Sequence, residues 1–253
     1  MEVHHRSHGH GKKKFGDYLS EFLMIFLAVT AGFFAETFRE HISDTQKERE
    51  YIHSLIADLK QDTSQIGYVS QSLFRNIKGQ DSLIALLKEF KPNDSTVKIA
   101  YRYYLRYTIG VPQVLFNEGA ITQLLASGNM RLITHDHVSD SIMDYHNMIN
   151  YTKLQGQYYN EQFRTCFDFS TNIFDFSIAH RALKEDYTFV STGAPFGGHL
   201  PPIKSDSLQL QKYANELTML ESIVSGYVLN LRATKMAAVR LMNLLRKEYD
   251  LEE

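Results

Sequence analysis

The sequence is poor in residues that cross-link a chain or interrupt a helix. Its 253 residues include a single cysteine, Cys166, and five prolines, at positions 92, 112, 195, 201 and 202. A single thiol excludes an internal disulfide, and the phenylalanines around Cys166 indicate a buried structural thiol rather than a nucleophile. The prolines all fall at breaks between expected helices. Because no stretch keeps the alternating pattern of a strand, we expect an all-α fold.

The sequence also lacks an excess of charge of either sign. The formal net charge is −2 and the pI is near 6.6. A nucleic-acid-binding protein needs a concentrated basic face, so no nucleic-acid partner is expected. The glycines Gly197-Gly198 meet neither the GxGxxG nor the P-loop pattern, and no HExxH motif occurs. We therefore expect no cofactor and no enzymatic activity.

The most apolar stretch, residues 15–39, is predicted to be a membrane anchor. Its uncharged core, residues 22–35, has 14 residues and would span only about 21 Å of a hydrocarbon layer about 30 Å thick. A helix over residues 18–38 has 21 residues and spans about 31 Å, which is enough. Glu21 and Glu36 then lie near the two ends, where a carboxylate costs least because it reaches the headgroups.

Two other interpretations of this stretch compete with the anchor. In a cleaved signal peptide, Lys12–Lys14 would be the basic flank and Val29-Thr30-Ala31 the cleavage site, but the apolar run continues through Ala35. A soluble amphipathic helix needs a polar stripe, and residues 22–34 have none. The sequence therefore favours the anchor.

The anchor sets the predicted organisation of the chain. Cations at Arg6 and Lys12–Lys14 favour a cytoplasmic tail over residues 1–14. No later stretch reaches 18 apolar residues, so residues 40–253 are expected to form one helical domain outside the cytoplasm. In a bacterium, this corresponds to an inner-membrane protein with a periplasmic domain.

Helical periodicity continues after the anchor. An apolar face runs from Ile52 to Phe90, with possible kinks at Gly67 and Gly79, and ends before Pro92. Asp94 or Ser95 is expected to cap a second helix. A short helix follows, which is opened by residues 117–120, contains Ile121, Leu124 and Leu125, and is closed by residues 127–129. A longer helix is then capped by Thr134 or Asp136 and runs towards Phe163.

The C-terminal helix carries the clearest pattern in the chain. Eleven residues alternate spacings of three and four, as in a coiled-coil seam: Leu210, Tyr213, Leu217, Leu220, Val224, Tyr227, Leu231, Thr234, Ala238, Leu241 and Leu245. The pattern predicts packing in a long-helix bundle with the helix that follows the anchor, or pairing with a second copy. Thr234 and Ala238 form a thin part of the seam, where a neighbouring helix could approach closely.

Several polar and aromatic groups are candidate binding sites. Arg102 and Arg106, beside Tyr101, Tyr104 and Tyr107, fit either an anion site or an amphipathic helix whose arginines reach solvent. Residues 158–190 are rich in phenylalanine and tyrosine, which indicates the packing centre of the domain or, alternatively, a ligand pocket. The loop at residues 191–202, with His199, would border such a pocket.

Two clusters could bind metal. The first is the tail set of His4, His5, His8 and His10, which fits a metal-binding tract or a disordered basic tail at the membrane surface. The second is His137, Asp140 and Asp144, which share a helix face at i, i+3 and i+7. The alternative for the second is a solvated face whose acids favour the helix dipole.

The N-terminal third resembles an uncharacterised family of single-pass membrane proteins common in Bacteroidota. The matching segments are Met1–His5, Lys12–Lys14, Glu21–Val29, Gly32–Glu36, Arg39–His41, Ser54-Leu55 and Asp58–Thr63, with Leu124–Gly128 and Arg131–Ile133 further along. The resemblance implies an anchor and a helical extracytoplasmic domain. It implies no activity and no catalytic residues.

The expected function is a membrane-anchored binding or scaffolding protein. Its partners would be the membrane and either another envelope protein or a second copy of itself. The first alternative is a ligand sensor with an aromatic pocket. The second, less favoured, is a metal-dependent enzyme that uses His137, Asp140 and Asp144.

Overall fold

The structure, a computed structural model, describes residues 15–178, 200–203 and 206–251. The described residues form five α-helices and a 3₁₀ turn with no strand, which confirms the all-α prediction. The elements are α1 (Phe15–Lys88), α2 (Asp94–Tyr107), α3 (Gly119–Ala126), η1 (Asn129–Leu132), α4 (Asp136–Ser170) and α7 (Ser207–Glu248). The chain divides into two units, residues 1–50 and 51–253. The second unit begins inside the helical domain predicted over residues 40–253.

The first unit contains the apolar part of α1. Large side chains there are exposed on every face of the helix, including Phe22 at 62%, Phe26 at 53% and Phe34 at 66%. One 18-residue window of α1 has a mean hydropathy of 1.8 and no buried residue. Glu36 and Arg39 form an ion pair at the end of the run. This part of α1 is therefore long and apolar enough to cross a membrane, a criterion that some signal sequences also meet.

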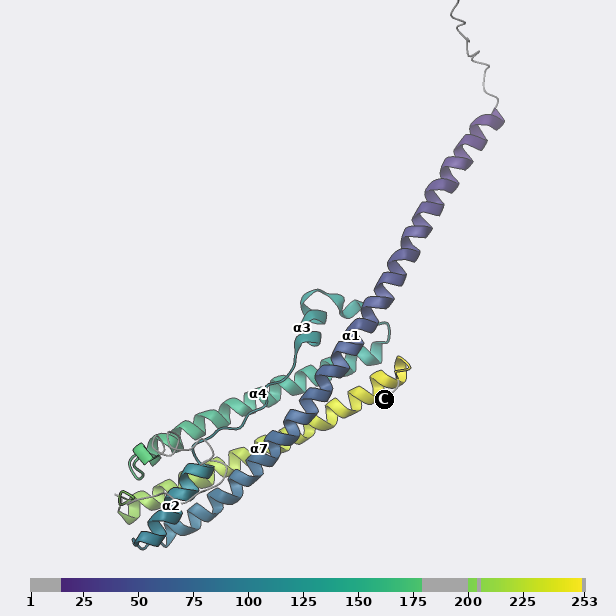
Figure 1. The fold of residues 1–253 in the computed structure, drawn as a ribbon. Helices are drawn as coiled ribbons and strands as arrows, with labels where there is room; N and C mark the ends of the chain where they lie inside the picture. Colours follow the sequence, from purple (N-terminus) through teal and green to yellow (C-terminus); the bar gives the residue numbers. More distant parts are fainter. Residues whose placement is uncertain (1–14, 179–199, 204–205, 252–253) are drawn as a thin grey trace, which may run out of the picture. The chain divides into compact units, whose positions relative to one another are not determined.

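The second unit is a bundle of three long helices. Figure 1 shows α1 beyond residue 51, α4 and α7 running along one another, with α2 and α3 near opposite ends of the bundle. All eleven seam residues of α7 are buried within this chain. The seam therefore packs inside the bundle, one of the two arrangements that the sequence allowed.

The bundle core has two apolar clusters separated along every long helix by a polar residue. The first cluster contains α1 residues from Ile52 to Leu59 together with residues of α3. The second cluster contains α1 residues from Ile66 onward together with residues of α2. Between them lie Asp62 on α1, Thr152 on α4 and Thr234 on α7, all with no exposed surface. The Thr152 and Thr234 hydroxyls are 2.8 Å apart. The thin part of the seam is thus where α4 approaches α7.

The helix ends follow local capping chemistry, with two corrections to the sequence prediction. Asn93, not Asp94 or Ser95, caps α2, because its side chain accepts from the Thr96 amide while the Thr96 hydroxyl accepts from the Asn93 amide. Residue 135, not Thr134 or Asp136, is the N-cap of α4, and it makes no side-chain capping bond. Gly128, with φ of 66°, follows α3 as predicted.

Helix α1 is unbroken across both glycines that were expected to be possible kinks. Gly79 is instead required by packing. A β-carbon there would lie 2.1 Å from ring atoms of Tyr107, which rests on the α1 backbone. The neighbouring Gln80 side chain donates to the Tyr107 carbonyl at 2.8 Å, so α2 ends against this point of α1.

Gly79→Ala is expected to destabilise the bundle by about 1–3 kcal/mol, because the added methyl group displaces the Tyr107 ring. The gain of about 1 kcal/mol in helix propensity that alanine brings is smaller than this cost. Gly226→Ala is the matched control, since its added methyl group meets nothing within 4 Å. Thermal melts followed by circular dichroism should show Gly226→Ala more stable than the parent chain and Gly79→Ala less stable. Equal gains would show that Tyr107 moves aside without cost.

Candidate functional site

The structure does not gather the predicted metal ligands into a site. His137 Nε2 lies 3.5 Å from Glu248 of α7, while Asp140 and Asp144 are exposed. Asp144 lines a groove of about 560 Å³ between α4 and α7, together with Arg240. Across the described ranges, no group of three or more His, Cys, Asp or Glu residues could hold a metal ion. The tail histidines His4, His5, His8 and His10, and His199 of the loop, lie outside the described residues.

The aromatic candidates divide between the core and the surface. Tyr101 and Tyr104 are fully buried and contact Phe174, with Tyr104 stacked on it at 4.1 Å between ring centroids. Tyr107 and Arg106 instead border a surface groove between α1 and α2. Phe174 belongs to the aromatic segment predicted over residues 158–190. Its ring packs against the rings of Tyr101 and Tyr104, as expected of a packing centre.

Cys166 is the structural thiol that the sequence predicts. It is buried, and its Sγ donates to the Glu216 carbonyl of α7 at 3.2 Å. Burial raises the pKa of the Cys166 thiol to about 12. A thiol with that pKa is protonated at neutral pH, so it lacks the thiolate that nucleophilic chemistry uses.

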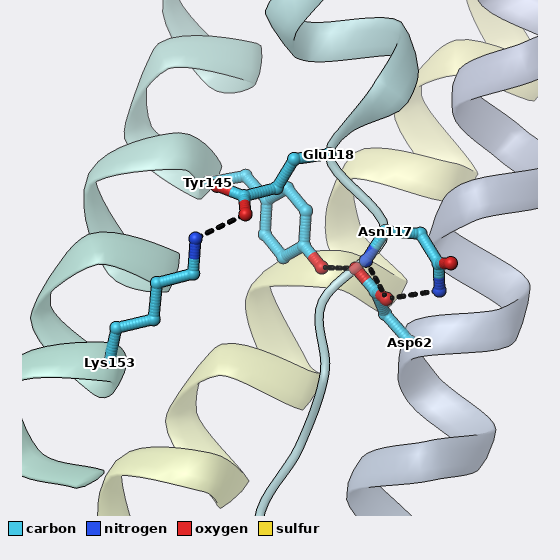
Figure 2. A network of polar contacts seen from close by, with 5 residues as sticks. All are labelled: Asp62, Asn117, Glu118, Tyr145 and Lys153. Atoms are coloured by element: carbon cyan, nitrogen blue, oxygen red, sulfur yellow. Dashed lines mark hydrogen bonds and ion pairs between the residues drawn. The ribbon is translucent and has the colours of Figure 1, made fainter. Parts of the chain in front are cut away.

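The most organised polar site centres on Asp62, a fully buried carboxylate of α1 (Figure 2). Its Oδ1 accepts from both the backbone amide and the side-chain amide of Asn117, each at 2.8 Å. Its Oδ2 accepts from the Tyr145 hydroxyl of α4 at 2.7 Å. One side chain therefore joins α1, α4 and the segment before α3.

A second carboxylate and an ion pair extend this site. Asp58, one turn before Asp62, accepts from the Ala120 amide at 3.1 Å. It thereby serves as a cap for α3, whose own N-cap residue, Glu118, makes no side-chain capping bond. Figure 2 shows Glu118 paired instead with Lys153 of α4.

The electrostatics of the site favour a structural role. Burial and the nearby Asp58 charge raise the pKa of Asp62, and its three hydrogen bonds only partly offset this. Burial and the Asp62 carboxylate likewise raise the pKa of Tyr145. Asp62 has no exposed surface through which a substrate could reach it. We refer to Asp58, Asp62, Asn117 and Tyr145 as the polar clamp, since together they fix the segment before α3.

The polar clamp was not predicted from the sequence. Asp62 occupies an i, i+3 position in the apolar stripe between Leu59 and Ile66. An acid inside an apolar stripe is the signal that could have found it, because a buried carboxylate needs donors. Its partners Asn117 and Tyr145 lie 55 and 83 residues away, and nothing in the sequence pairs them.

A half-buried carboxylate, Glu221 of α7, faces α1. Its Oε1 is buried without a hydrogen-bond partner among the described residues. Burial, followed by the Asp81 charge, raises the pKa of Glu221 to about 7, although Lys88 opposes the shift. The Glu221 carboxyl group therefore changes its protonation state near neutral pH.

Glu221→Gln is expected to remove a pH dependence of stability between about pH 4.5 and 7. The folded chain binds the Glu221 proton more tightly than the unfolded chain, so this contribution is complete below the unfolded pKa and is lost as the pH rises through the folded pKa. Allowing for solvent screening, the variant should gain on the order of 1 kcal/mol at pH 8. Melts at pH 5 and pH 8 test this, with exposed Glu161→Gln as the control. A parallel pH dependence in the parent chain and Glu221→Gln would contradict it.

Comparison of the chain with protein-family models, with curated proteins and with solved structures found no match. The function is therefore argued from the residues of this chain and their geometry.

Proposed function

We propose that this chain is a membrane-anchored helical binding or scaffolding protein, an accessory subunit or interaction partner in the bacterial envelope. The observation that carries the proposal is that α1 combines an apolar segment with no buried residue and a core-forming segment that includes Ile52 and Leu59. A core helix of a soluble protein would bury its apolar surface. An exposed apolar surface of this size is instead typical of a segment that meets lipid.

The continuity of α1 favours an anchor over a cleaved signal peptide. Cleavage after Ala31 would leave Phe33 and Phe34 exposed to water at the new end of the helix, where they are 69% and 66% exposed. Retained, the same residues extend the apolar run to a length that spans the hydrocarbon layer. The cations before residue 15 support a cytoplasmic tail, which would place the bundle in the periplasm.

Binding is favoured over the two alternatives. A sensor would need an aromatic pocket, and the rings of Tyr101, Tyr104 and Phe174 fill the space between them. A metal-dependent enzyme would need His137, Asp140 and Asp144 to converge, and His137 faces Glu248. A bundle with surface grooves is instead suited to holding a partner.

Membrane extraction tests the anchor. The full-length chain should stay in the membrane pellet after alkaline carbonate treatment. Val29→Arg places a charge in the middle of the span, which disfavours insertion by about 2.5–3.5 kcal/mol, and should release the chain. Lys47→Arg, which lies outside the span and leaves the charge unchanged, should have no effect. Release of the parent chain by carbonate, or a mature N-terminus near residue 32, would refute the anchor.

Partner capture tests the binding role. The full-length chain, purified from native membranes in mild detergent, should carry a stoichiometric partner that survives washing. For orientation, Ser7→Cys and Ser95→Cys are each placed in a Cys166→Ala background. A membrane-impermeant maleimide added to spheroplasts should label the cysteine at position 95 and not that at position 7. Recovery of the chain without a partner would shift support to the sensor alternative.

A further inference from the structure

The surface groove of about 560 Å³ between α4 and α7 carries one charge on each wall. Asp144 lies on the α4 wall and Arg240 on the α7 wall, and both side chains are exposed. Neither forms an ion pair with any residue that the structure describes. Met148, Ala237 and Leu244 also line the groove. The groove therefore presents apolar surface between two opposite charges.

Two exposed tyrosines continue this surface along α4. Tyr151 and Tyr158 follow Asp144 at intervals of seven residues, so the three side chains share one face of the helix. Tyr151 is 51% exposed and Tyr158 is 49% exposed. Tyrosine is enriched at protein–protein interfaces relative to the rest of the surface. The row of an acid and two rings is therefore suited to a protein partner.

Helix α7 presents a corresponding row. Gly226 and Ala233 precede Arg240 at intervals of seven residues, so these three positions also share one face. A β-carbon added at Gly226 would meet nothing within 4 Å, so the space above the backbone is open there. Small, partly exposed residues at two of the three positions leave room for a ring from another molecule.

The two rows lie at the same height because α4 and α7 run antiparallel. The Thr152 hydroxyl meets that of Thr234, and the Gly156 backbone lies against the Tyr227 ring. These contacts fix the register, and counting outward from them matches the two rows to within about half a helical turn. The matched positions are Asp144 with Arg240, Tyr151 with Ala233, and Tyr158 with Gly226. We call the surface formed by these six residues the α4–α7 face.

We propose that the α4–α7 face binds a second copy of the same chain, related by a two-fold axis parallel to the helices. Such an axis exchanges α4 with α7 and keeps each residue at its own height. The Asp144 carboxylate of each copy then pairs with Arg240 of the other, and the two tyrosines cover the other copy's Ala233 and Gly226. In both copies α1 enters the bundle from the same end, as two anchors in one membrane require. The inference rests on the proposed function and names its partner.

The charge pattern favours a second copy over an unrelated protein. A surface with an acid on one wall and a base on the other is complementary to itself, because a two-fold axis makes the same Asp144–Arg240 contact twice. A purely acidic partner would oppose Asp144 with a like charge, and a purely basic partner would do the same at Arg240. An apolar partner would bury both charges without neutralising them.

Sedimentation velocity of the full-length chain in mild detergent tests the inference, and the parent chain should be a dimer. Asp144→Arg or Arg240→Asp places like charges in contact twice in each dimer, so each should raise the dimer Kd at least about tenfold. Both changes combined restore opposite charges in reversed order and should recover the dimer. Arg232→Asp is the matched control, because it makes the same change at an exposed position of α7 outside the groove, and it should change Kd less than about twofold. Unchanged circular dichroism verifies that the variants fold.

Cysteine cross-linking between two differently tagged copies tests the register. One copy carries Tyr158→Cys and the other Gly226→Cys, each in a Cys166→Ala background, so that neither chain can cross-link within itself. A short bis-maleimide should join the two tagged copies. Replacing Gly226→Cys by Tyr68→Cys gives the control, because Tyr68 is exposed on α1, and this pair should not be joined.

The remaining outcomes separate this inference from the proposed function. A monomeric parent chain, a dimer that the combined reversal does not recover, or equal cross-linking in the control pair would overturn the proposed dimer. Cross-linking of position 158 to a different protein in place of a second copy would also overturn it. If a monomeric chain still holds another partner, the α4–α7 inference is wrong and the binding role stands. A monomeric chain without any partner would contradict both.

Discussion

Leu231→Asp is expected to unfold the bundle. Leu231 is a seam residue of α7 with no exposed surface, inside the cluster that also contains Leu73 and Tyr159. The change removes about 2–3 kcal/mol of apolar burial and places an unpaired charge in the core. The sum exceeds about 4 kcal/mol, which is comparable to the whole stability of a typical domain. A circular-dichroism melt of the full-length chain measures the loss directly.

Leu229→Asp is the matched control for this change. It makes the same substitution two residues earlier on the same helix, where the side chain is 66% exposed. We expect a cost of less than about 1 kcal/mol, mainly from the lower helix propensity of aspartate. An unchanged melting temperature for Leu231→Asp would show that the seam is not buried in the protein in solution. A dissociated oligomer with an intact melt would show that the seam packs between copies.

Asp62→Ala is expected to have the second-largest effect. It leaves the Tyr145 hydroxyl and both amides of Asn117 without their acceptor inside the bundle. Leaving a buried donor unsatisfied costs about 1–3 kcal/mol, so the total loss should be about 3 kcal/mol or more. Hydrogen exchange should also accelerate at residues 113–126, because the clamp no longer fixes the segment before α3.

Two milder variants separate the parts of the clamp. Asp62→Asn keeps an acceptor for Asn117 and removes the buried charge, so a loss of only about 1 kcal/mol is expected. Tyr145→Phe removes a single hydroxyl and leaves Asn117 in place, with a similar small loss. If Asp62→Ala costs no more than Tyr145→Phe, the contacts to Asn117 contribute little. Slow exchange at residues 113–126 in Asp62→Ala would show that other contacts hold this segment.

The two apolar clusters explain why a polar layer is tolerated in the core. Asp62, Thr152 and Thr234 interrupt the apolar faces of three helices, and each is buried. Thr234 also donates to the Asn230 carbonyl of its own helix at 2.9 Å, so its hydroxyl is satisfied even without α4. Polar positions of this kind disfavour sliding of one helix past another, because any shift buries a donor or acceptor without its partner.

Local patterns in the sequence determined the elements and the faces that they bury. The spacing from Leu210 to Leu245 predicted the buried seam, and the apolar run from Phe22 to Ala35 predicted the exposed part of α1. Proline and glycine marked the helix ends correctly at residues 92 and 128. These features depend on residues within a few turns of one another, where helix geometry relates sequence spacing to position in space.

Only the tertiary structure decided which distant groups meet. The residues that meet are separated by 28 positions or more in the sequence: Asp62 with Asn117 and Tyr145, Glu221 with Asp81, and Gly79 with Tyr107. The seam could equally have paired with a second copy, and the His137 face could have met further ligands. Helix periodicity specifies which face of each helix is buried, but the partner of that face depends on how the helices pack. The same packing placed Asp144 and Arg240 on the two walls of one groove.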